Sequence, residues 1–245
     1  MEQTLLVAVL FVAVAALYSS VGHAGASGYL AVMAIVGIEP ALMRPTALVL
    51  NILVASIVVA RFARAGQIEW RALLPFVAAS VPLAFIGGSI VLPGAAYKPL
   101  VGIVLLVAAV RFLMTAGRSR EEGTVRVPAL PAVAIGGGTG LVAGLTGTGG
   151  GIFLTPVLLI LRWAGARQAA GLSSGFILAN SLAGLAGNVA SVGIIPAALA
   201  VWLPAVAIGG LVGSQLGARR LSPPGIRRAL ALVLVVAGLK LIFVG

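Results

Sequence analysis

The stretch Gly136–Pro156, GGGTGLVAGLTGTGGGIFLTP, decides the fold of this chain. Nine of its 21 residues are glycine and most of the others are apolar. A glycine string that opens a helix can cradle phosphate in a soluble nucleotide-binding domain, but that site needs a preceding strand and a later acidic residue. The chain contains no aspartate at all. Inside a bilayer, backbone leaves a helix only where protein or a water-filled cavity satisfies its polar groups. We therefore predict a broken membrane helix at Gly147–Gly151, with a binding site at the break.

The composition of the whole chain supports a membrane protein. Its 245 residues are 61% hydrophobic and 9% charged, with a mean hydropathy of +1.19. Soluble domains are about 25% charged, so this chain cannot cover a water-facing surface. It contains no cysteine, which excludes disulfides and cysteine-ligated metal sites. We expect no metal and no cofactor, and we interpret the apolar N-terminus as a retained first segment.

Ten apolar stretches predict an all-α polytopic membrane protein. Clusters of glycine, proline or arginine separate them, and their approximate ranges are 4–20, 28–38, 41–60, 72–92, 97–116, 132–145, 152–161, 168–187, 197–218 and 229–244. The polar segment 118–131 is the expected cytoplasmic linker between a first repeat, 1–117, and a second repeat, 132–245. We expect each stretch to cross the membrane once.

Two of these stretches are too short for a full crossing. A helix needs about 20 residues to span the hydrocarbon core, and the stretches 28–38 and 152–161 have only about half that number. Each follows a glycine-rich break, at 21–27 and at Gly147–Gly151. Short, interrupted segments at corresponding positions of two halves are typical of transporter binding sites.

The two halves repeat the same order of features, which is a break, a short helix, a helix with an asparagine, a helix with a proline and a closing helix. Asn51 corresponds to Asn180 in this order. If the N-terminus lies outside, 13 of the 16 basic residues fall at the inner face, as the positive-inside rule requires. Because each half then crosses an odd number of times, the halves are inverted, with broken helices meeting at the midplane. We expect a prokaryotic plasma membrane, both termini outside, and no binding to nucleic acid.

A helix N-terminus offers free N–H groups and a partial positive charge, so two of them meeting at the midplane can bind an anion. The predicted substrate-binding residues come from both breaks and from the helices beside them. They are Gly22, His23, Gly25, Ser27, Asn51, Thr146, Thr148, Gly149, Gly150, Gly151, Ser174 and Asn180. His23 is the only histidine, and it is the candidate for proton coupling because histidine exchanges a proton near neutral pH.

Four segments of the chain resemble the TauE/SafE family of sulfite exporters, also called the sulfonate uptake permease family. These segments are VGHAGASGYLAVMA (21–34), PTALVLN (45–51), TGTGGGIFLTP (146–156) and SSGFILANSLAGLAGN (173–188). The resemblance covers nearly the whole chain. It implies a plasma-membrane carrier of small sulfur-containing anions such as sulfite or organosulfonates, working by alternating access.

Several alternatives remain open at this point. A passive anion channel or a carrier of small carboxylates would fit the same pattern. Gly25-Ala26-Ser27-Gly28 with His23 nearby also resembles a serine-nucleophile turn, although a hydrolase needs an oriented partner for its base. We expect no enzymatic activity. The expected partners are a small anion and the lipid bilayer, and a homodimer is open. Asn51 and Asn180 could instead bond helix to helix, Ser173 and Ser174 could be packing residues, and Glu39 with Arg44 forms either a gate or a plain interfacial pair.

Overall fold

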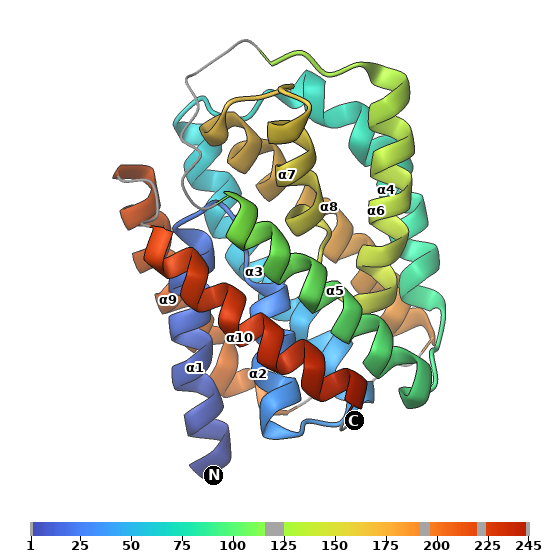
Figure 1. Cartoon of the computed structure of the whole chain (residues 1–245), viewed down its shortest axis with the longest axis vertical. Helices are drawn as coiled ribbons and strands as arrows, with labels where there is room; N and C mark the ends of the chain where they lie inside the picture. Colours follow the sequence, from blue (N-terminus) through green and yellow to red (C-terminus); the bar gives the residue numbers. More distant parts are fainter. Residues whose placement is uncertain (1, 116–124, 192–196, 220–223, 244–245) are drawn as a thin grey trace.

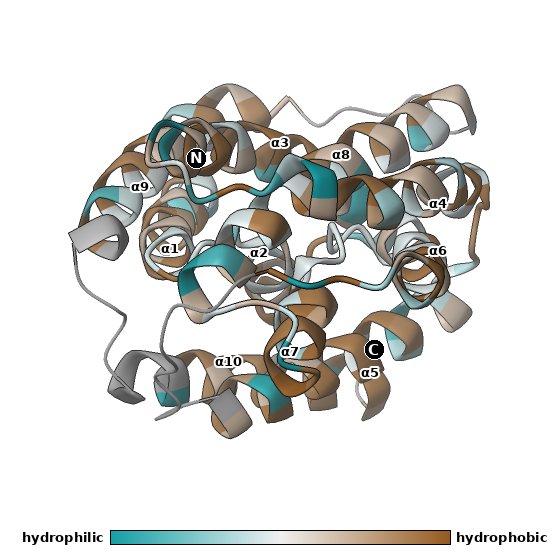
Figure 2. Cartoon of the chain, turned by 90° about the horizontal axis from the view of Figure 1, so that it is seen from above, coloured by the Kyte–Doolittle hydropathy of each residue, from teal (hydrophilic) through white to brown (hydrophobic). Residues whose placement is uncertain are grey.

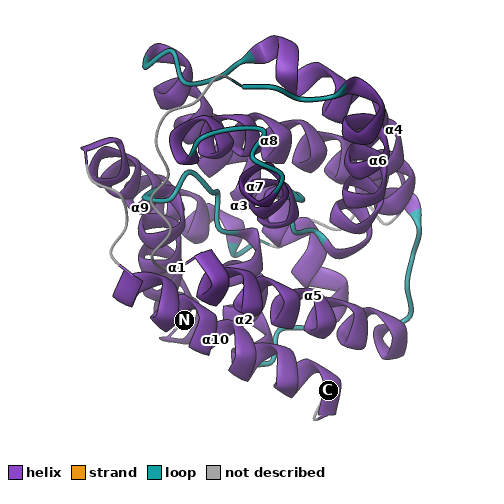
Figure 3. Ribbon diagram, turned by 45° about the horizontal axis from the view of Figure 1, so that its top comes forward, coloured by secondary structure: helices purple, strands orange, loops and turns teal. Residues whose placement is uncertain are grey.

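The computed structural model describes residues 2–115, 125–191, 197–219 and 224–243, and these residues form ten helices joined by loops (Figures 1 and 3). Residues 118–124 of the predicted linker 118–131 lie outside the described residues. In chain order the helices are α1 (Glu2–Ser19), α2 (Ala26–Val36), α3 (Pro40–Arg64), α4 (Trp70–Ser89), α5 (Gly94–Thr115), α6 (Ala129–Thr146), α7 (Gly151–Ile160), α8 (Ala166–Ser191), α9 (Leu199–Arg219) and α10 (Pro224–Phe243).

The all-α prediction and the ten predicted stretches are confirmed, with ends that differ by a few residues. Seven of the described helices are long and apolar enough to cross a membrane. The two predicted short helices, α2 and α7, have 11 and 10 residues. At 1.5 Å per residue these are about 16 and 15 Å long, roughly half of the ~30 Å hydrocarbon core.

The expectation that every segment crosses once is wrong for the helices beside the breaks. The amide of Gln3, at the start of α1, donates a 3.3 Å hydrogen bond to the carbonyl of Val36, at the end of α2. The Arg126 N–H, just before α6, likewise donates to the carbonyl of Trp163, just after α7, at 2.9 Å. Each pair is therefore a hairpin whose two open ends lie at one end of the molecule (Figure 1). The left-handed glycines in the breaks reverse the chain direction.

The two hairpins open at opposite ends of the molecule. The chain termini lie at the lower end in Figure 1, where α2 ends, whereas α6 starts and α7 ends at the upper end. After a hairpin, the chain continues on the same side of the membrane as before it, just as it would after two full crossings. The predicted side of every later loop is therefore unchanged by this correction.

Helices of the two sequence halves are interleaved. α1 packs mainly on α9, α6 packs on α4, α3 lies against α8, and α5 lies against α10. The larger buried core accordingly combines first-half residues such as Phe11 and Leu105 with second-half residues such as Trp202 and Leu234. The division of the chain into a first and a second repeat stays a prediction.

Glycine stripes allow the closest helix contacts. On α6, Gly136, Gly140 and Gly144 lie directly over the backbone carbonyls of Phe76, Ser80 and Ala84 on α4, where a Cβ atom would collide. On α9, Gly209 and Gly213 lie in the same way over carbonyls of α1. Small residues at every fourth position are the usual device for close helix packing in membranes. Gly209 and Gly213 therefore serve the packing of α9 on α1.

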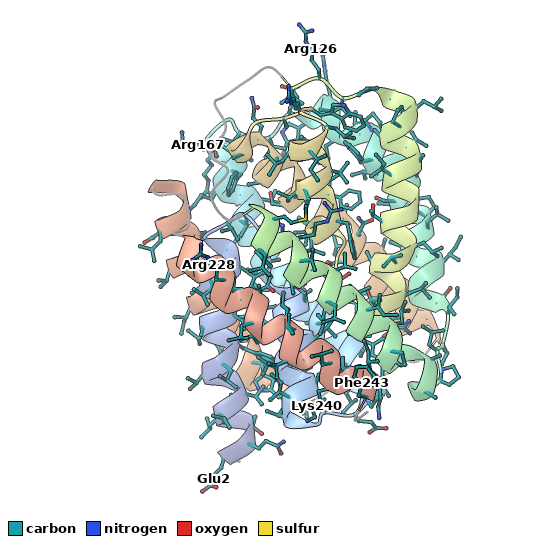
Figure 4. The ribbon with its side chains drawn as sticks, in the orientation of Figure 1. Glu2, Arg126, Arg167, Arg228, Lys240 and Phe243 are labelled. Carbon is teal, nitrogen blue, oxygen red and sulfur yellow. The ribbon has the colours of Figure 1, made fainter. Side chains whose placement is uncertain are left out.

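Much of the outer surface is apolar, and most of the charged residues labelled in Figure 4 lie at its two ends, whereas Arg228 lies at mid-height. Leu6, Leu74 and Leu232 are 56%, 63% and 66% exposed, and hydrophobic residues cover most of the helices in Figure 2. Figure 4 places Arg126 and Arg167 at the upper end, and Glu2 and Lys240 at the lower end. Helices that are apolar on both faces need lipid on the outer one, so this surface fits a bilayer.

Candidate functional site

The first break reverses the chain between α1 and α2. Gly22 and Gly25 adopt φ values of +79° and +103°, which side chains other than glycine rarely tolerate. Gly25 is the N-cap of α2 and has no side chain of its own with which to cap this helix. Gly22 packs directly against Ala170 at the start of α8, which places the first break beside the second half of the chain.

The second break reverses the chain between α6 and α7 in the same way. Gly147, Gly149 and Gly150 have φ values of +84°, +72° and +79°. Gly150 is the N-cap of α7, again with no side-chain cap. These three left-handed positions need glycine because a Cβ atom there would meet the next carbonyl oxygen. Neither Ser27 nor Thr148, two of the predicted substrate-binding residues, is the N-cap of its neighbouring short helix.

Asn51 joins the two breaks. Its Oδ1 accepts a 3.2 Å hydrogen bond from the N–H of Ala26, the first residue of α2. Its Nδ2 donates a 2.8 Å hydrogen bond to Ser181 Oγ on α8. Gly149 lies against this pair, so closely that a Cβ atom would collide with the Asn51 amide. The tip of α2 and the second break therefore meet at one buried polar point, as the sequence predicted.

His23 connects the first break to α7. Its Nδ1 lies 3.2 Å from the carbonyl oxygen of Val21, so this nitrogen carries a hydrogen. Its Nε2 lies 3.2 Å from the Thr155 hydroxyl, which in turn donates a 2.6 Å bond to Ser173 Oγ. While Thr155 donates to Ser173, Nε2 must donate to Thr155, which requires a protonated ring. A neutral ring instead needs the Thr155 hydroxyl to turn towards Nε2.

Other predicted hydroxyls bond within the protein. Ser27 Oγ donates to Tyr18 Oη at 3.0 Å, Ser174 Oγ donates to the Gly171 carbonyl at 2.7 Å, and the Thr146 and Thr148 hydroxyls lie 3.0 Å apart. Because the Ser27 hydroxyl donates to a tyrosine, it is not activated by His23, and the serine-hydrolase arrangement is not formed. A substrate role for these hydroxyls stays a prediction.

Asn180 is the exception, because both polar atoms of its fully buried amide lack a hydrogen-bond partner among the residues that the structure describes. Residues four apart on a helix share a face. Four residues before Asn180 is Phe176, which contacts Gly150, and four residues after it is Gly184, which contacts Gly144. The Asn180 side of α8 therefore faces the chain between Gly144 and Gly150. Each unsatisfied buried polar group costs about 1–3 kcal/mol, so this amide is a place for a ligand or water.

All twelve predicted site residues are buried. Asn51 and Asn180, for example, are 1% and 0% exposed. The polar point between the breaks is therefore closed to both ends of the molecule. The sequence analysis missed Ser181, Thr155 and the importance of Arg44. The first two are small hydroxyl residues in glycine-rich segments, where only the fold shows what they touch.

Arg44 could have been found from the sequence, because an ionisable residue within an apolar helix is a site candidate by default. It is only 6% exposed. Its guanidinium donates to the Ile90 carbonyl at 2.9 Å and lies 3.5 Å from those of Gly87 and Leu145. These carbonyls lie at the C-terminal ends of α4 and α6, where a cation is favoured. The plain interfacial pair of Arg44 with Glu39 is not formed.

The two hairpins, the apolar outer surface and the buried polar point where the breaks meet define the class of α-helical membrane proteins. The model of the family described as sulfite exporter TauE/SafE matches residues 6–241, and the chain belongs to this family. It is 41% identical over 240 residues to the probable membrane transporter protein y4hK of Sinorhizobium fredii, covering 96% of this chain and 97% of that protein.

A more distant relative is the probable membrane transporter protein MJ0441 of Methanocaldococcus jannaschii. It is 29% identical over 196 residues, which cover 73% of this chain and 70% of that protein. No solved structure matches the chain. The prediction of a TauE/SafE membrane transporter is thus confirmed at the level of family and class.

Proposed function

We propose that this protein is a secondary carrier of a small oxyanion, of the sulfite or organosulfonate class, that works by alternating access. The observation that carries the proposal is the Asn180 amide, which is buried without a partner on the face of α8 beside the second break. An amide N–H₂ next to the N-terminus of α7 offers hydrogen-bond donors and a partial positive charge to an anion. No acidic side chain lies in either break or in either short helix.

Inverted repeats would supply the two states of such a carrier. Exchanging α1–α5 with α6–α10 turns the α1–α9 contact into the α6–α4 contact and leaves α3–α8 and α5–α10 unchanged. A two-fold axis in the membrane plane has this effect. Asn51 contacts Ser181, which is next in the chain to Asn180, the counterpart of Asn51. A contact between nearly equivalent residues of the two halves is expected close to the two-fold axis. The pattern supports two inverted halves, each with one hairpin and three crossing helices, whose exchange of conformations would open the site to either side.

Membrane orientation follows from the charges. The basic residues at the ends of α3 and α7 and at the starts of α4, α6 and α8 gather at the upper end in Figure 4. We propose that this end faces the cytoplasm of a prokaryotic cell and that both termini lie outside. A buried site in the described residues favours a carrier over an open channel, since a conducting pore needs a continuous path.

Counterflow in proteoliposomes tests this proposal. Vesicles loaded with unlabelled sulfoacetate should transiently accumulate external labelled sulfoacetate above its equilibrium level, because only a carrier exchanges substrate in this way. Labelled sulfite and acetate, each with its own unlabelled counterpart inside, define the anion class. Asn180→Leu should abolish accumulation by all of them. Uptake without counterflow would support the channel, and counterflow with acetate alone would support a carboxylate carrier.

The role of His23 in proton coupling is part of this proposal. The His23–Thr155–Ser173 chain links the first break to α7 and α8. Protonation of the ring determines whether Thr155 donates to Ser173 or to His23. Because Thr155 belongs to α7, this change of hydrogen bond would alter the packing of α7. Transport measured against pH, described in the Discussion, tests it.

A further inference from the structure

A separate cavity lies against Arg44, away from the polar point between the breaks. Its volume is about 210 Å³, room for roughly seven water molecules at ~30 Å³ each. Its lining comes from the start of α3, the loop after α4, the start of α5 and the end of α8, and includes Glu39, Arg44, Tyr97 and Asn188. In Figure 1 these helix ends lie at the lower end of the molecule, with both chain termini.

Arg44 carries a buried charge, and its hydrogen-bond partners in the described part of the chain are all neutral. Three backbone carbonyls lie within 3.5 Å of one of its terminal nitrogens. In the amide orientation that satisfies both residues, Asn188 Oδ1 accepts from Nη2 at 2.6 Å and from Nε at 3.0 Å. A guanidinium has five N–H groups, so one N–H on Nη2 stays available. Burying an ion is costly unless an opposite charge pairs with it.

Glu39 is the one carboxylate that lines this cavity, and it is exposed and forms no ion pair with Arg44. The cavity therefore combines a buried cation, room for a small solute and an exposed carboxylate in its lining. Arg44 also connects it to the transport site, because its backbone and side-chain stem pack on Gly147 at the start of the second break.

We propose that this cavity is a second anion-binding site, an outer vestibule in which a small oxyanion pairs with Arg44 before it reaches the breaks. Asn188 holds the guanidinium in place, and the anion bonds to its remaining N–H. The Glu39 carboxylate competes with the anion for the same positive charge. This site goes beyond the proposed function, because it can bind an anion whether or not the breaks transport one.

Cysteine protection tests the vestibule, because the chain has no cysteine of its own. Ala41 lines the cavity and is exposed, so Ala41→Cys should react with a membrane-impermeant cationic methanethiosulfonate added outside proteoliposomes or cells. Sulfoacetate, which does not attack the reagent, should slow this reaction in a saturable manner, compared with chloride at equal ionic strength. Glu2→Cys at the same end of the molecule should react at a rate that sulfoacetate leaves unchanged.

Second-site variants decide whether Arg44 is responsible. Arg44→Gln in the Ala41→Cys background should raise the half-protecting sulfoacetate concentration at least about tenfold, as expected for loss of a charge-assisted pair. Lys98→Gln, which removes a cation near the same end but outside the cavity lining, should leave the half-protecting concentration unchanged. Glu39→Gln should lower that concentration, and this variant keeps the test decisive if Arg44→Gln does not fold.

Asn51→Leu separates this inference from the proposed function. It removes the polar link between the breaks and leaves the cavity lining intact. Protection of Ala41→Cys should persist in Asn51→Leu although transport is lost. The vestibule is refuted if sulfoacetate fails to protect Ala41→Cys in the otherwise unchanged protein, or if protection survives in a folded Arg44→Gln variant.

Discussion

Asn51 on α3 donates a 2.8 Å hydrogen bond to Ser181 on α8, and this bond crosses between the two halves of the chain at the point where both breaks meet. The same amide accepts the first N–H of α2. Gly149 of the second break lies directly on the amide. A movement of the first hairpin against α3 must therefore strain the bond from Ala26, and a movement of the second hairpin must shift Gly149 against the Asn51 amide. We expect this contact to be a sensitive point for the transport cycle.

Gly149→Ala should abolish transport, whereas Gly37→Ala should preserve it. Both glycines have positive φ, +72° and +77°, so both variants pay the roughly 1–2 kcal/mol cost of a left-handed alanine. Only the Gly149 methyl group collides with Asn51 and Ser181, because a Cβ atom at Gly37 meets nothing within 4 Å. Sulfoacetate counterflow by the two variants, normalised to folded protein, makes the comparison. Equal activity would mean that the Asn51 contact does not matter.

Leucine at the two asparagines should change stability in opposite directions. Asn180→Leu removes two unpartnered polar atoms and should stabilise the protein by about 1–3 kcal/mol. Asn51→Leu leaves the Ala26 N–H and the Ser181 hydroxyl without their partner and should destabilise it by a similar amount. Thermal unfolding of the two purified variants in the same detergent measures the difference. We expect neither to transport, and destabilisation by Asn180→Leu would show that its amide has a partner in the resting protein.

His23→Gln should flatten the pH dependence of transport between pH 5 and 8. Glutamine keeps a hydrogen-bond donor and acceptor near Thr155 but does not titrate in this range. Thr155→Val should have a similar effect, since it interrupts the chain between His23 and Ser173 without removing the titrating ring. Initial uptake rates at fixed substrate gradients, with the internal and external pH varied together, provide the measurement. A pH profile unchanged in both variants would exclude His23 as the coupling group.

Gly140→Ala should destabilise the contact between α4 and α6, whereas Gly138→Ala should not. Gly140 lies over the backbone of Ser80, where an added methyl group collides with backbone atoms. Gly138 is exposed on the same helix and has no neighbour within 4 Å, so alanine there should be neutral or stabilise by up to about 1 kcal/mol. Detergent thermal unfolding of both variants gives the comparison. Similar unfolding temperatures of the two variants would show that α4 and α6 can move apart with little loss of stability.

The predicted helix positions agree with the structure because membrane helices are set by local chemistry. An apolar stretch in lipid must satisfy its own backbone, and a glycine or proline cluster ends it, so segment limits can be read from residues close in sequence. The glycine breaks were equally visible, since only glycine adopts repeated left-handed backbone at Gly147, Gly149 and Gly150 without strain.

The direction of the chain after each break was not visible. A string of glycines allows a helix to continue across the membrane or to turn back, and the two outcomes differ only in tertiary contacts such as Gln3 with Val36. The placement of Arg44 was hidden for the same reason. Its charge suggested a gate or an interfacial pair with Glu39, whereas the carbonyls that surround it come from the C-terminal ends of α4 and α6.

By itself, the sequence determined the class of protein, the ten helices, the two breaks and most candidate residues, because hydrophobicity and glycine conformation act over short distances along the chain. Only the tertiary structure decided that α1–α2 and α6–α7 are hairpins, that Asn51 is bonded while Asn180 is not, and that Arg44 lines a cavity. Those outcomes depend on which helices lie side by side, and residues 130 positions apart, such as Asn51 and Ser181, carry no local signal that they will meet.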